Sequence, residues 1–219
     1  MAWDDDRSGP RPGVLIAHTI RGRSEFECGK AEALARLGYV GFALDVYGRG
    51  RVADDHAVAE PWMRALLGDR PGLQRRMQLG LEAAAAQAEV DASRIAAIGY
   101  CFGGLSVLDL ARVDDRPLGV ASFHGLLDRP AGLAQRPIRS RILILHGWDD
   151  PLATPEAVVR AAAEFTAAGA DWQLHAYGHA AHSFTNPGAA NPERGLVYHP
   201  AADRRSWRAL EDFLAELFA

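Results

Sequence analysis

Residues 95–110 read IAAIGYCFGGLSVLDL, and this stretch decides the fold class. A short apolar run leads into a turn in which glycines surround Cys101, and apolar residues at helical spacing follow. A strand that turns sharply into a helix around a reactive side chain is a nucleophile elbow, here with cysteine in place of serine. Gly99 and Gly103 suit this turn because a Cβ at either position would approach neighbouring backbone. The stretch therefore predicts a strand, a strained turn at Cys101 and a helix.

Cys101 would lie at the N-terminus of the helix that follows it. The unsatisfied N–H groups and the positive end of the helix dipole would then face the sulfur, which lowers the pKa of a thiol and favours the reactive thiolate. The alternative is that Cys101 is a small buried apolar residue, as most intracellular cysteines are. Taken alone, the residue favours that alternative, so the choice depends on the rest of the chain.

Two later segments carry the partners that a nucleophilic cysteine needs. An apolar strand over 141–146 ends in HGWDDP, and His182 follows the strand-like residues 172–177. Nucleophile, acid and histidine come in the chain order of the α/β-hydrolase triad. His182 would take the proton from Cys101, while an aspartate from HGWDDP would fix the imidazole tautomer and stabilise the imidazolium.

Three motifs resemble those of the dienelactone hydrolase family: IGYCFGG at 98–104, HGWDDP at 146–151 and AHSFTNP at 181–187. The resemblance runs from about Pro12 to the C-terminus. It implies an α/β-hydrolase fold and hydrolysis of esters or lactones through a thioester acyl-enzyme, with no cofactor. The family places its acid directly before the proline, which favours Asp150 over Asp149. By position, Cys101, Asp150 and His182 would be the catalytic residues.

The segment AHTIRG at 17–22 departs from the family pattern. Members that cleave dienelactone carry a glutamate here close to the nucleophile, and arginines bind the substrate carboxylate. Thr19 stands at the glutamate position and cannot act as that base, which argues against dienelactone itself as the substrate. Glu25 and Glu27 are explained more simply as favourable charges at the start of a helix. The backbone N–H groups of Ile20 and Phe102 are expected to form the oxyanion hole.

Three residues are predicted to bind substrate. Thr19 and Arg21 lie on the predicted oxyanion loop, and Arg21 would suit an anionic substrate. Trp62 belongs to the segment 48–72, which we expect above the sheet with an apolar lining typical of small-molecule pockets. An equally good interpretation makes Trp62 part of the buried face of a helix.

Composition favours one ordinary enzyme domain. The 219 residues are 48% hydrophobic and can bury a sizeable core without metals or disulfides. A net charge of −4 excludes a basic field for nucleic acid or an anionic membrane. No apolar run approaches a membrane span, and the acidic start is unlike a secretory signal, so we expect a cytoplasmic protein. The two cysteines cannot form a disulfide framework, and Cys28 is expected to pack on a helix.

The chain predicts short apolar strands at 14–18, 40–44, 94–98, 119–123, 141–146 and 172–177. Apolar residues at helical spacing predict helices between and after these strands, at 27–37, 61–67, 73–88, 105–111, 155–168 and 202–217. Alternation of this kind predicts an α/β three-layer sandwich with a wholly parallel sheet of six strands.

Residues 1–12 are polar and are predicted to form a flexible arm before a single α/β-hydrolase domain at 13–219. This arm replaces the antiparallel strand pair with which relatives usually begin. The strand 40–44 would then be an unprotected sheet edge, which chains often cover or pair with a partner. We therefore expect a monomer, or a homodimer formed through that edge.

Other histidines give weaker signals. His175, His179 and His182 could suggest a metal site, but they span a strand and a turn without a nearby carboxylate or cysteine cluster, so no metal is predicted. His124 and His146 each precede a glycine at a strand end and are expected to be structural. The main rival hypothesis is a ligand-binding or thiol redox-sensing protein on a hydrolase scaffold, because an activated Cys101 would suit it too.

Overall fold

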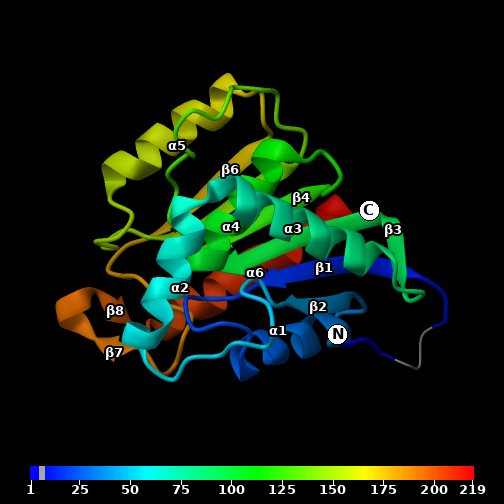
Figure 1. Cartoon of the computed structure of the whole chain (residues 1–219), viewed down its shortest axis with the longest axis horizontal. Coiled ribbons are helices and arrows are strands. Elements are labelled where there is room, and N and C mark those ends of the chain that lie inside the picture. Colours follow the sequence, from blue (N-terminus) through cyan, green and yellow to red (C-terminus); the bar gives the residue numbers. More distant parts are fainter. Residues whose placement is uncertain (5–7) are drawn as a thin grey trace.

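The computed structural model describes residues 1–4 and 8–219, and its central feature is a parallel sheet (Figure 1). The sheet has six strands in the order β2-β1-β3-β4-β5-β6, and each neighbouring pair is parallel. Its strands are β1 (Arg11–Ala17), β2 (Val40–Leu44), β3 (Val90–Tyr100), β4 (Gly119–Phe123), β5 (Arg141–Gly147) and β6 (Trp172–Tyr177). This arrangement confirms the predicted α/β-hydrolase fold with a parallel sheet.

Helices cover both faces of the sheet (Figure 1). α1 (Glu25–Arg36) and α6 (Pro200–Leu217) pack on one face, and α3 (Arg70–Ala85), α4 (Phe102–Val113) and α5 (Pro155–Ala167) pack on the other. The helix α2 (His56–Gly68) precedes α3 and contributes residues to the carboxyl-terminal edge of the sheet. The result is a three-layer sandwich with helices outside and strands between them.

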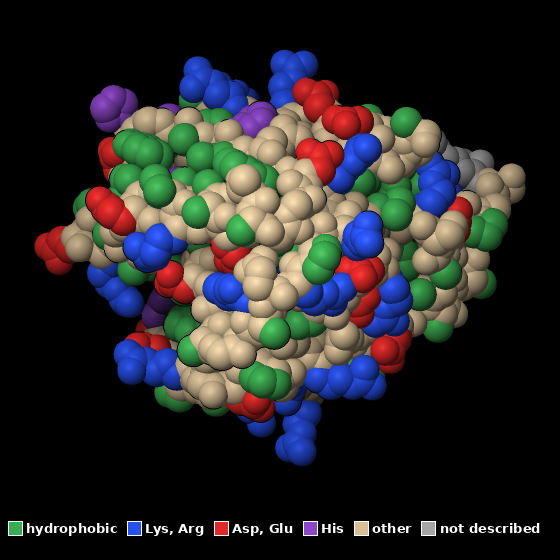
Figure 2. Space-filling model, turned by 90° about the horizontal axis from the view of Figure 1, so that it is seen from above, with side chains coloured by type: hydrophobic (Ala, Val, Ile, Leu, Met, Phe, Trp, Pro, Cys, Tyr) green, Lys and Arg blue, Asp and Glu red, His purple; other side chains and the backbone are tan. Residues whose placement is uncertain are grey.

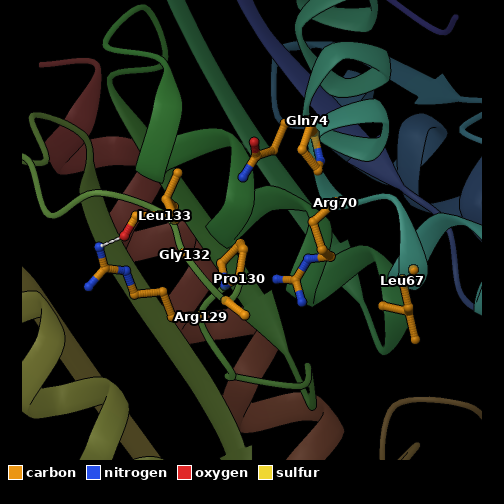
Figure 3. Close-up of a pocket in the computed structure, with 10 residues that line it drawn as sticks. Leu67, Arg70, Gln74, Arg129, Pro130, Gly132 and Leu133 are labelled. Atoms are coloured by element: carbon orange, nitrogen blue, oxygen red, sulfur yellow. Dashed lines mark hydrogen bonds between the residues drawn. The ribbon is translucent and has the colours of Figure 1, made fainter.

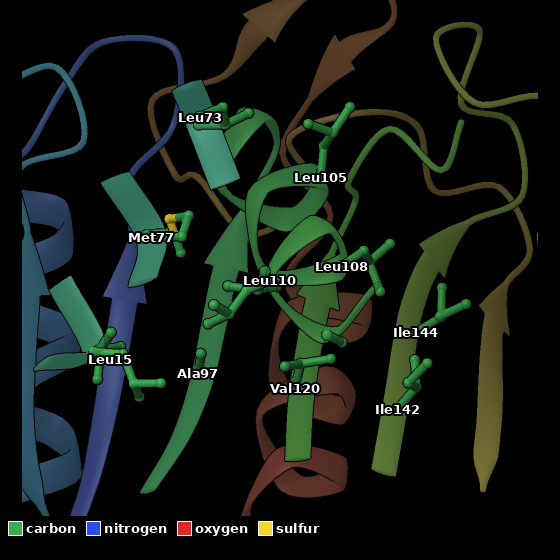
Figure 4. Packing of buried hydrophobic residues seen from close by; sticks show 14 of the residues in the cluster. Leu15, Leu73, Met77, Ala97, Leu105, Leu108, Leu110, Val120, Ile142 and Ile144 are labelled. Carbon is green, nitrogen blue, oxygen red and sulfur yellow. The ribbon is translucent and has the colours of Figure 1, made fainter. Parts of the chain in front are cut away.

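Each central strand supplies side chains to two separate cores. In β1, Leu15 and Ala17 pack with α3 and α4, whereas Val14 and Ile16 pack with α1. Figure 4 shows the first of these cores, where Leu73 and Met77 of α3 lie on the same side of the sheet as Leu15 of β1. Successive strand residues point to opposite faces, so a strand buried on both sides must be apolar throughout. This explains why the strands read as continuous apolar runs.

Strand boundaries differ from the expected ones where pairing extends beyond the apolar run. Arg11 and Pro12 lie in β1 because they pair with Val90 and Asp91 of β3, before a register shift at Pro12/Gly13. We had placed both in the arm at 1–12, of which residues 5–7 lie outside the described residues. Backbone pairing of polar residues leaves no hydrophobic pattern, so sequence reasoning missed this extension.

The helix α2 begins earlier than the sequence suggested. We expected it to start at Pro61, since proline favours the first turn of a helix. Instead Pro61 lies inside the helix, and the helix starts at His56. The cap is Asp55, whose carboxylate accepts a hydrogen bond of 2.9 Å from the N–H of Ala57.

The edge strand β2 is partly covered. Ala2 forms an antiparallel bridge with Gly41, and each N–H donates to the other's carbonyl at 2.9 Å. The prediction that β2 forms an edge is confirmed by the strand order. A homodimer through this edge stays a prediction, as does the division of the chain into an arm and one domain.

A second, two-stranded sheet was not expected. β7 (Ala190–Asn191) and β8 (Leu196–Val197) pair antiparallel, and the short 3-10 helix η1 (Pro192–Arg194) joins them. In Figure 1 this hairpin lies beside α2, at the end of the molecule away from the N-terminus. Strands of two residues are too short to produce a periodic sequence pattern.

Charges are dispersed over the surface. Figure 2 shows one face, on which Lys and Arg side chains are interspersed with Asp and Glu side chains. Among the described residues, no helix has the length and apolar character needed to cross a membrane. The predicted cytoplasmic location stays a prediction.

Candidate active site

Cys101 occupies a strained turn between β3 and α4. Its φ of 55° and ψ of −115° lie in a region that residues with a Cβ seldom adopt, and its N–H donates a 3.0 Å hydrogen bond to the Phe123 carbonyl. A Cβ at Gly99 would lie 2.1 Å from the Gly103 carbonyl oxygen, and one at Gly103 would lie 2.1 Å from that of Ala17. Glycine is therefore required at both positions, as the elbow motif predicts.

Asp150 and His182 meet at the same edge of the sheet. The Nδ1 atom of His182 lies 2.8 Å from Oδ2 of Asp150, and both side chains are almost fully buried. Asp150 also accepts a 2.8 Å hydrogen bond from the N–H of Leu152, which holds its carboxylate in place. Asp149 is exposed, and its carboxylate lies 3.8 Å from His179 instead. Of the two candidate acids, Asp150 is the one in contact with the predicted histidine.

The charges of Cys101 and His182 favour each other. Burial raises the pKa of the Cys101 thiol, but His182 and the N–H groups of Phe102 and Ile20 outweigh this effect and lower it. Burial lowers the pKa of His182, but the charges of Cys101 and Asp150 prevail and raise it. Nε2 of His182 is buried and has no partner of normal hydrogen-bond geometry among the described residues. The pair is therefore disposed to exist as thiolate and imidazolium.

The loop at Thr19 and Ile20 is held by a buried carboxylate. Oε1 of Glu27 accepts a 3.1 Å hydrogen bond from the N–H of Thr19, while Oε2 accepts from the N–H and Oγ of Ser24 at 2.8 and 2.7 Å. Glu27 is fully buried. The sequence suggested only that Glu27 is a favourable charge at the start of a helix. The structure shows that its carboxylate also connects α1 to the loop whose Ile20 N–H faces the Cys101 sulfur.

His18 supports the same loop from the other side. The N–H of Val46 donates to its Nε2 at 3.1 Å, so Nδ1 carries the proton and donates to the Thr19 carbonyl at 2.6 Å. Both ring nitrogens are thus engaged, so His18 has a structural role in this loop.

A cavity of about 410 Å³ opens over Cys101. Residues from α2 and from the β7–β8 hairpin contribute to its walls, and Thr19 and Arg21 line it as predicted. Its other lining residues are Ile20, Phe26, His56, Glu60, Met63, His124, Leu126, Leu152, His182, Ser183, Thr185, Asn186, Arg194 and Leu196. Trp62 does not line this cavity, since its ring packs edge-on against Tyr47 at 5.7 Å. A small substrate with an apolar body and a polar end fits this lining.

The family follows from comparison with known proteins. A profile of the dienelactone hydrolase family matches residues 2–218. The chain belongs to the dienelactone hydrolase family. Membership supports a carboxylic ester hydrolase, the class of enzyme that the sequence predicts.

Individual relatives of this dienelactone hydrolase family member cover most of its length. A dienelactone hydrolase-like promiscuous phosphotriesterase from metagenomic libraries is 40% identical, with a TM-score of 0.94 over 99% of this chain and 91% of that one. An uncharacterised protein of Caenorhabditis elegans is 36% identical over 69% of this chain and 98% of its own. A candidate carboxymethylenebutenolidase of Yersinia pestis is 24% identical over 99% of this chain and 82% of its own.

Sequence reasoning treated His124 as structural, yet it lines the cavity of this family member. Its Nε2 lies 2.8 Å from Oγ1 of Thr185, and its ring centroid lies 5.1 Å from that of His182. Burial, and then the neighbouring His182, hold the pKa of His124 well below its usual value, so the ring is neutral. The usable signal was its position at the end of β4, since ligands bind beyond the carboxyl ends of parallel strands.

The β7–β8 hairpin was not predicted from the sequence, although it holds the backbone at His182. The N–H of Val197 donates to the His182 carbonyl at 3.1 Å, and that of His199 donates to the Phe184 carbonyl at 3.1 Å. From this hairpin Arg194 and Leu196 reach the cavity lining. The hairpin therefore connects the position of His182 with one wall of the cavity.

A second hollow, also of about 410 Å³, lies away from these residues, between α3 and the loop after β4 (Figure 3). Arg70, Gln74, Pro130 and Leu133 are among its lining residues. The Arg70 guanidinium is already paired with Asp109 through two hydrogen bonds of 2.6 Å. No member of the predicted triad lines it, so the cavity over Cys101 is the candidate active site.

The three spaced histidines do not converge. His175 lies 3.3 Å from Gln173 on the same strand, His179 is exposed, and His182 is buried against Asp150. Within the described parts of the chain, no three His, Cys, Asp or Glu side chains are grouped to hold a metal ion. Cys28 is exposed, so the expectation that it packs was wrong.

Proposed function

We propose that the protein hydrolyses small esters or lactones through Cys101, His182 and Asp150. The observation that carries this proposal is the strained turn at Cys101, which lines the same cavity as a histidine whose Nδ1 lies 2.8 Å from a buried aspartate. A structural cysteine needs neither a positive φ nor such partners. Energetically costly geometry of this kind is typical of functional sites.

The proposed reaction has two steps. The Cys101 thiolate attacks the ester carbonyl, and the N–H groups of Ile20 and Phe102 stabilise the resulting oxyanion. The imidazolium of His182 then gives its proton to the departing alcohol, which leaves a thioester on Cys101. In the second step His182 takes a proton from water, the hydroxide attacks the thioester, and the carboxylic acid leaves as the Cys101 thiolate and the His182 imidazolium are restored. Asp150 stabilises the imidazolium that forms in each step.

The cavity lining indicates the kind of ester. Apolar residues such as Met63, Leu126 and Leu152 line the cavity and would contact a short acyl or alkyl group, while Arg21 and Arg194, which also line it, would attract a negative charge. Thr19 in place of the family glutamate argues for an ester other than dienelactone. We therefore propose small carboxylic esters or lactones, with anionic ones included.

Phosphotriester hydrolysis is the second candidate. It is favoured by the 40% identity to a promiscuous phosphotriesterase whose fold superimposes with a TM-score of 0.94. The same thiolate and oxyanion-binding N–H groups could act on a phosphorus centre, because they stabilise negative charge on an oxygen in both reactions.

The test uses p-nitrophenyl acetate and butyrate, a panel of small lactones, and diethyl p-nitrophenyl phosphate as substrates. We expect ester turnover in the wild type and a loss of at least about 1,000-fold in kcat for Cys101→Ala and for His182→Ala. Cys28→Ser is the matched control, because it removes the exposed thiol and leaves the site intact.

Each outcome decides between the hypotheses. Ester turnover lost in both site variants supports the cysteine hydrolase. Turnover of the phosphotriester alone supports the second candidate. Rapid alkylation of Cys101 by iodoacetamide without turnover of any substrate contradicts both and supports the ligand-binding or redox-sensing alternative.

A further inference from the structure

A second unusual site, centred on Lys30, lies on the face of the sheet that α1 and α6 cover. This residue is the only lysine in the chain. Its Nζ atom lies over three aromatic rings, at 5.2 Å from Phe26, 5.6 Å from Tyr100 and 5.0 Å from Trp207. The amine is thus enclosed by residues of α1, β3 and α6.

The site opens into a cavity of about 610 Å³ on the α1 and α6 face, lined by Lys30, Asp203, Arg204, Arg205, Trp207, Arg208 and Glu211. Its cations outnumber its carboxylates. The guanidinium groups of Arg205 and Arg208 form no hydrogen bond or ion pair with any residue in the described part of the chain. Two unpaired guanidinium groups beside an enclosed amine create a field that favours a small anion.

The amine itself is suited to nucleophilic attack. The Nζ atom of Lys30 has no hydrogen bond or ion pair with the residues that the structure describes, so it is not held by a carboxylate. Burial lowers the pKa of Lys30, although the Asp203 carboxylate acts in the opposite direction. Buried lysines of this kind are the ones that form imines with carbonyl compounds. The aromatic rings would stabilise a protonated imine as they stabilise the ammonium, since both are cations.

We propose that this cavity binds small phosphorylated aldehydes and holds them as an imine on Lys30. The uncharged amine attacks the aldehyde carbon, and the carbinolamine loses one water to form the imine. No electrons are gained or lost, and hydrolysis reverses the step. Arg205 and Arg208 bind the phosphate oxygens, which places the aldehyde near Nζ.

Pyridoxal 5′-phosphate is the probe. The full chain is incubated with it, reduced with borohydride so that an imine becomes a stable secondary amine, and mapped by peptide mass spectrometry. We expect one adduct per chain at Lys30, formed at a concentration about tenfold below that needed for pyridoxal, which lacks the phosphate. The N-terminal amine of Met1 is the internal reference for general amine reactivity.

Variants separate the amine from the anion site. Lys30→Arg keeps the cation among the rings and should take up no probe at position 30, while Met1 is labelled as in the wild type. The double change of Arg205→Ala with Arg208→Ala should raise the half-saturating concentration about tenfold, whereas Arg160→Ala on α5 should not change it. Ester hydrolysis reports whether each variant is folded. Equal labelling of Met1 and Lys30, or equal affinity for pyridoxal and its phosphate, overturns the proposal.

Discussion

The edge of the sheet that carries the proposed triad and the outer walls of the cavity are built in different ways. Cys101, Asp150 and His182 each follow a strand of the central sheet, and the last two are almost fully buried. The walls come from α2 and the β7–β8 hairpin, and Arg194 is exposed. The proposed catalytic groups are thus held by the buried part of the sheet, while Arg194 in the walls is open to solvent. Substitutions in the walls can change the substrate without disturbing the chemistry.

The largest expected effect comes from Gly103→Ala. The added Cβ would lie 2.1 Å from the Ala17 carbonyl oxygen and 2.7 Å from that of His18, so backbone must move at the elbow. We expect a loss of about 3 kcal/mol in the free energy of unfolding, measured by urea denaturation, together with loss of ester hydrolysis.

Gly29→Ala is the matched control for this change. Gly29 lies on the exposed side of α1 and has nothing within 4 Å of an added Cβ. The change should stabilise the protein by about 0.5 to 1 kcal/mol, because alanine is the better helix former. Equal stabilities of the two variants would contradict the tight packing of the elbow.

Glu27→Gln tests whether the buried Glu27 carboxylate positions the loop at Thr19 and Ile20. The variant loses one of the acceptors that hold Thr19 and Ser24, so the Ile20 N–H should point less accurately at the developing oxyanion. We expect kcat for ester hydrolysis to fall about 10- to 100-fold with little change in KM. Glu25→Gln, an exposed change in the same helical turn, should retain full activity. A higher KM at unchanged kcat would refute the positioning role.

The pH dependence of Cys101 alkylation tests the ion pair. The pKa of Cys101 is lowered and that of His182 is raised, so the thiolate should persist below the pH at which an ordinary thiol becomes protonated. For an ordinary thiol, with a pKa of about 8.5, the alkylation rate falls about tenfold per pH unit below that value. In a Cys28→Ser background, we expect the rate with iodoacetamide to fall less than about threefold from about pH 8 to about pH 6.5.

His182→Ala should restore the steep fall in this assay, because the imidazolium no longer stabilises the thiolate. A steep profile in both proteins would show that His182 does not set the charge of Cys101.

The smallest effect is expected in the wall. Arg194→Gln removes a positive charge from the cavity lining while the triad stays in place. We expect kcat/KM to fall about three- to tenfold for esters with a carboxylate and to stay nearly unchanged for neutral esters. A loss of kcat with both kinds of ester would mean that the hairpin wall also controls the reacting groups.

The same contrast explains what the sequence could predict. The strands 40–44, 119–123 and 172–177 match the structure in their bounds, since parallel strands buried on both faces produce apolar runs. The elbow was predictable because its turn leaves no room for a Cβ at Gly99 or Gly103, which restricts both positions to glycine. Asp150 and His182 could be placed because they follow strands whose ends meet at one edge.

The walls left no comparable signal. Arg194 and Leu196 reach the cavity from a hairpin whose strands have two residues each. Trp62 was an even choice between pocket and core, and it packs against Tyr47. For His124 the end of β4 indicated only a place near the cavity, and its 5.1 Å ring-to-ring distance from His182 depends on the fold. Positions set by long-range contacts of exposed segments do not show in local patterns.

The bridge between Ala2 and Gly41 has a consequence for the chain's behaviour in solution. The Gly41 amide at the sheet edge donates to Ala2, so it should exchange slowly with deuterium although its strand has a neighbour on one side only. Removal of the first four residues would leave that amide and its carbonyl open to a strand of another molecule. A shortened chain should therefore exchange faster at Gly41 and aggregate more readily on storage.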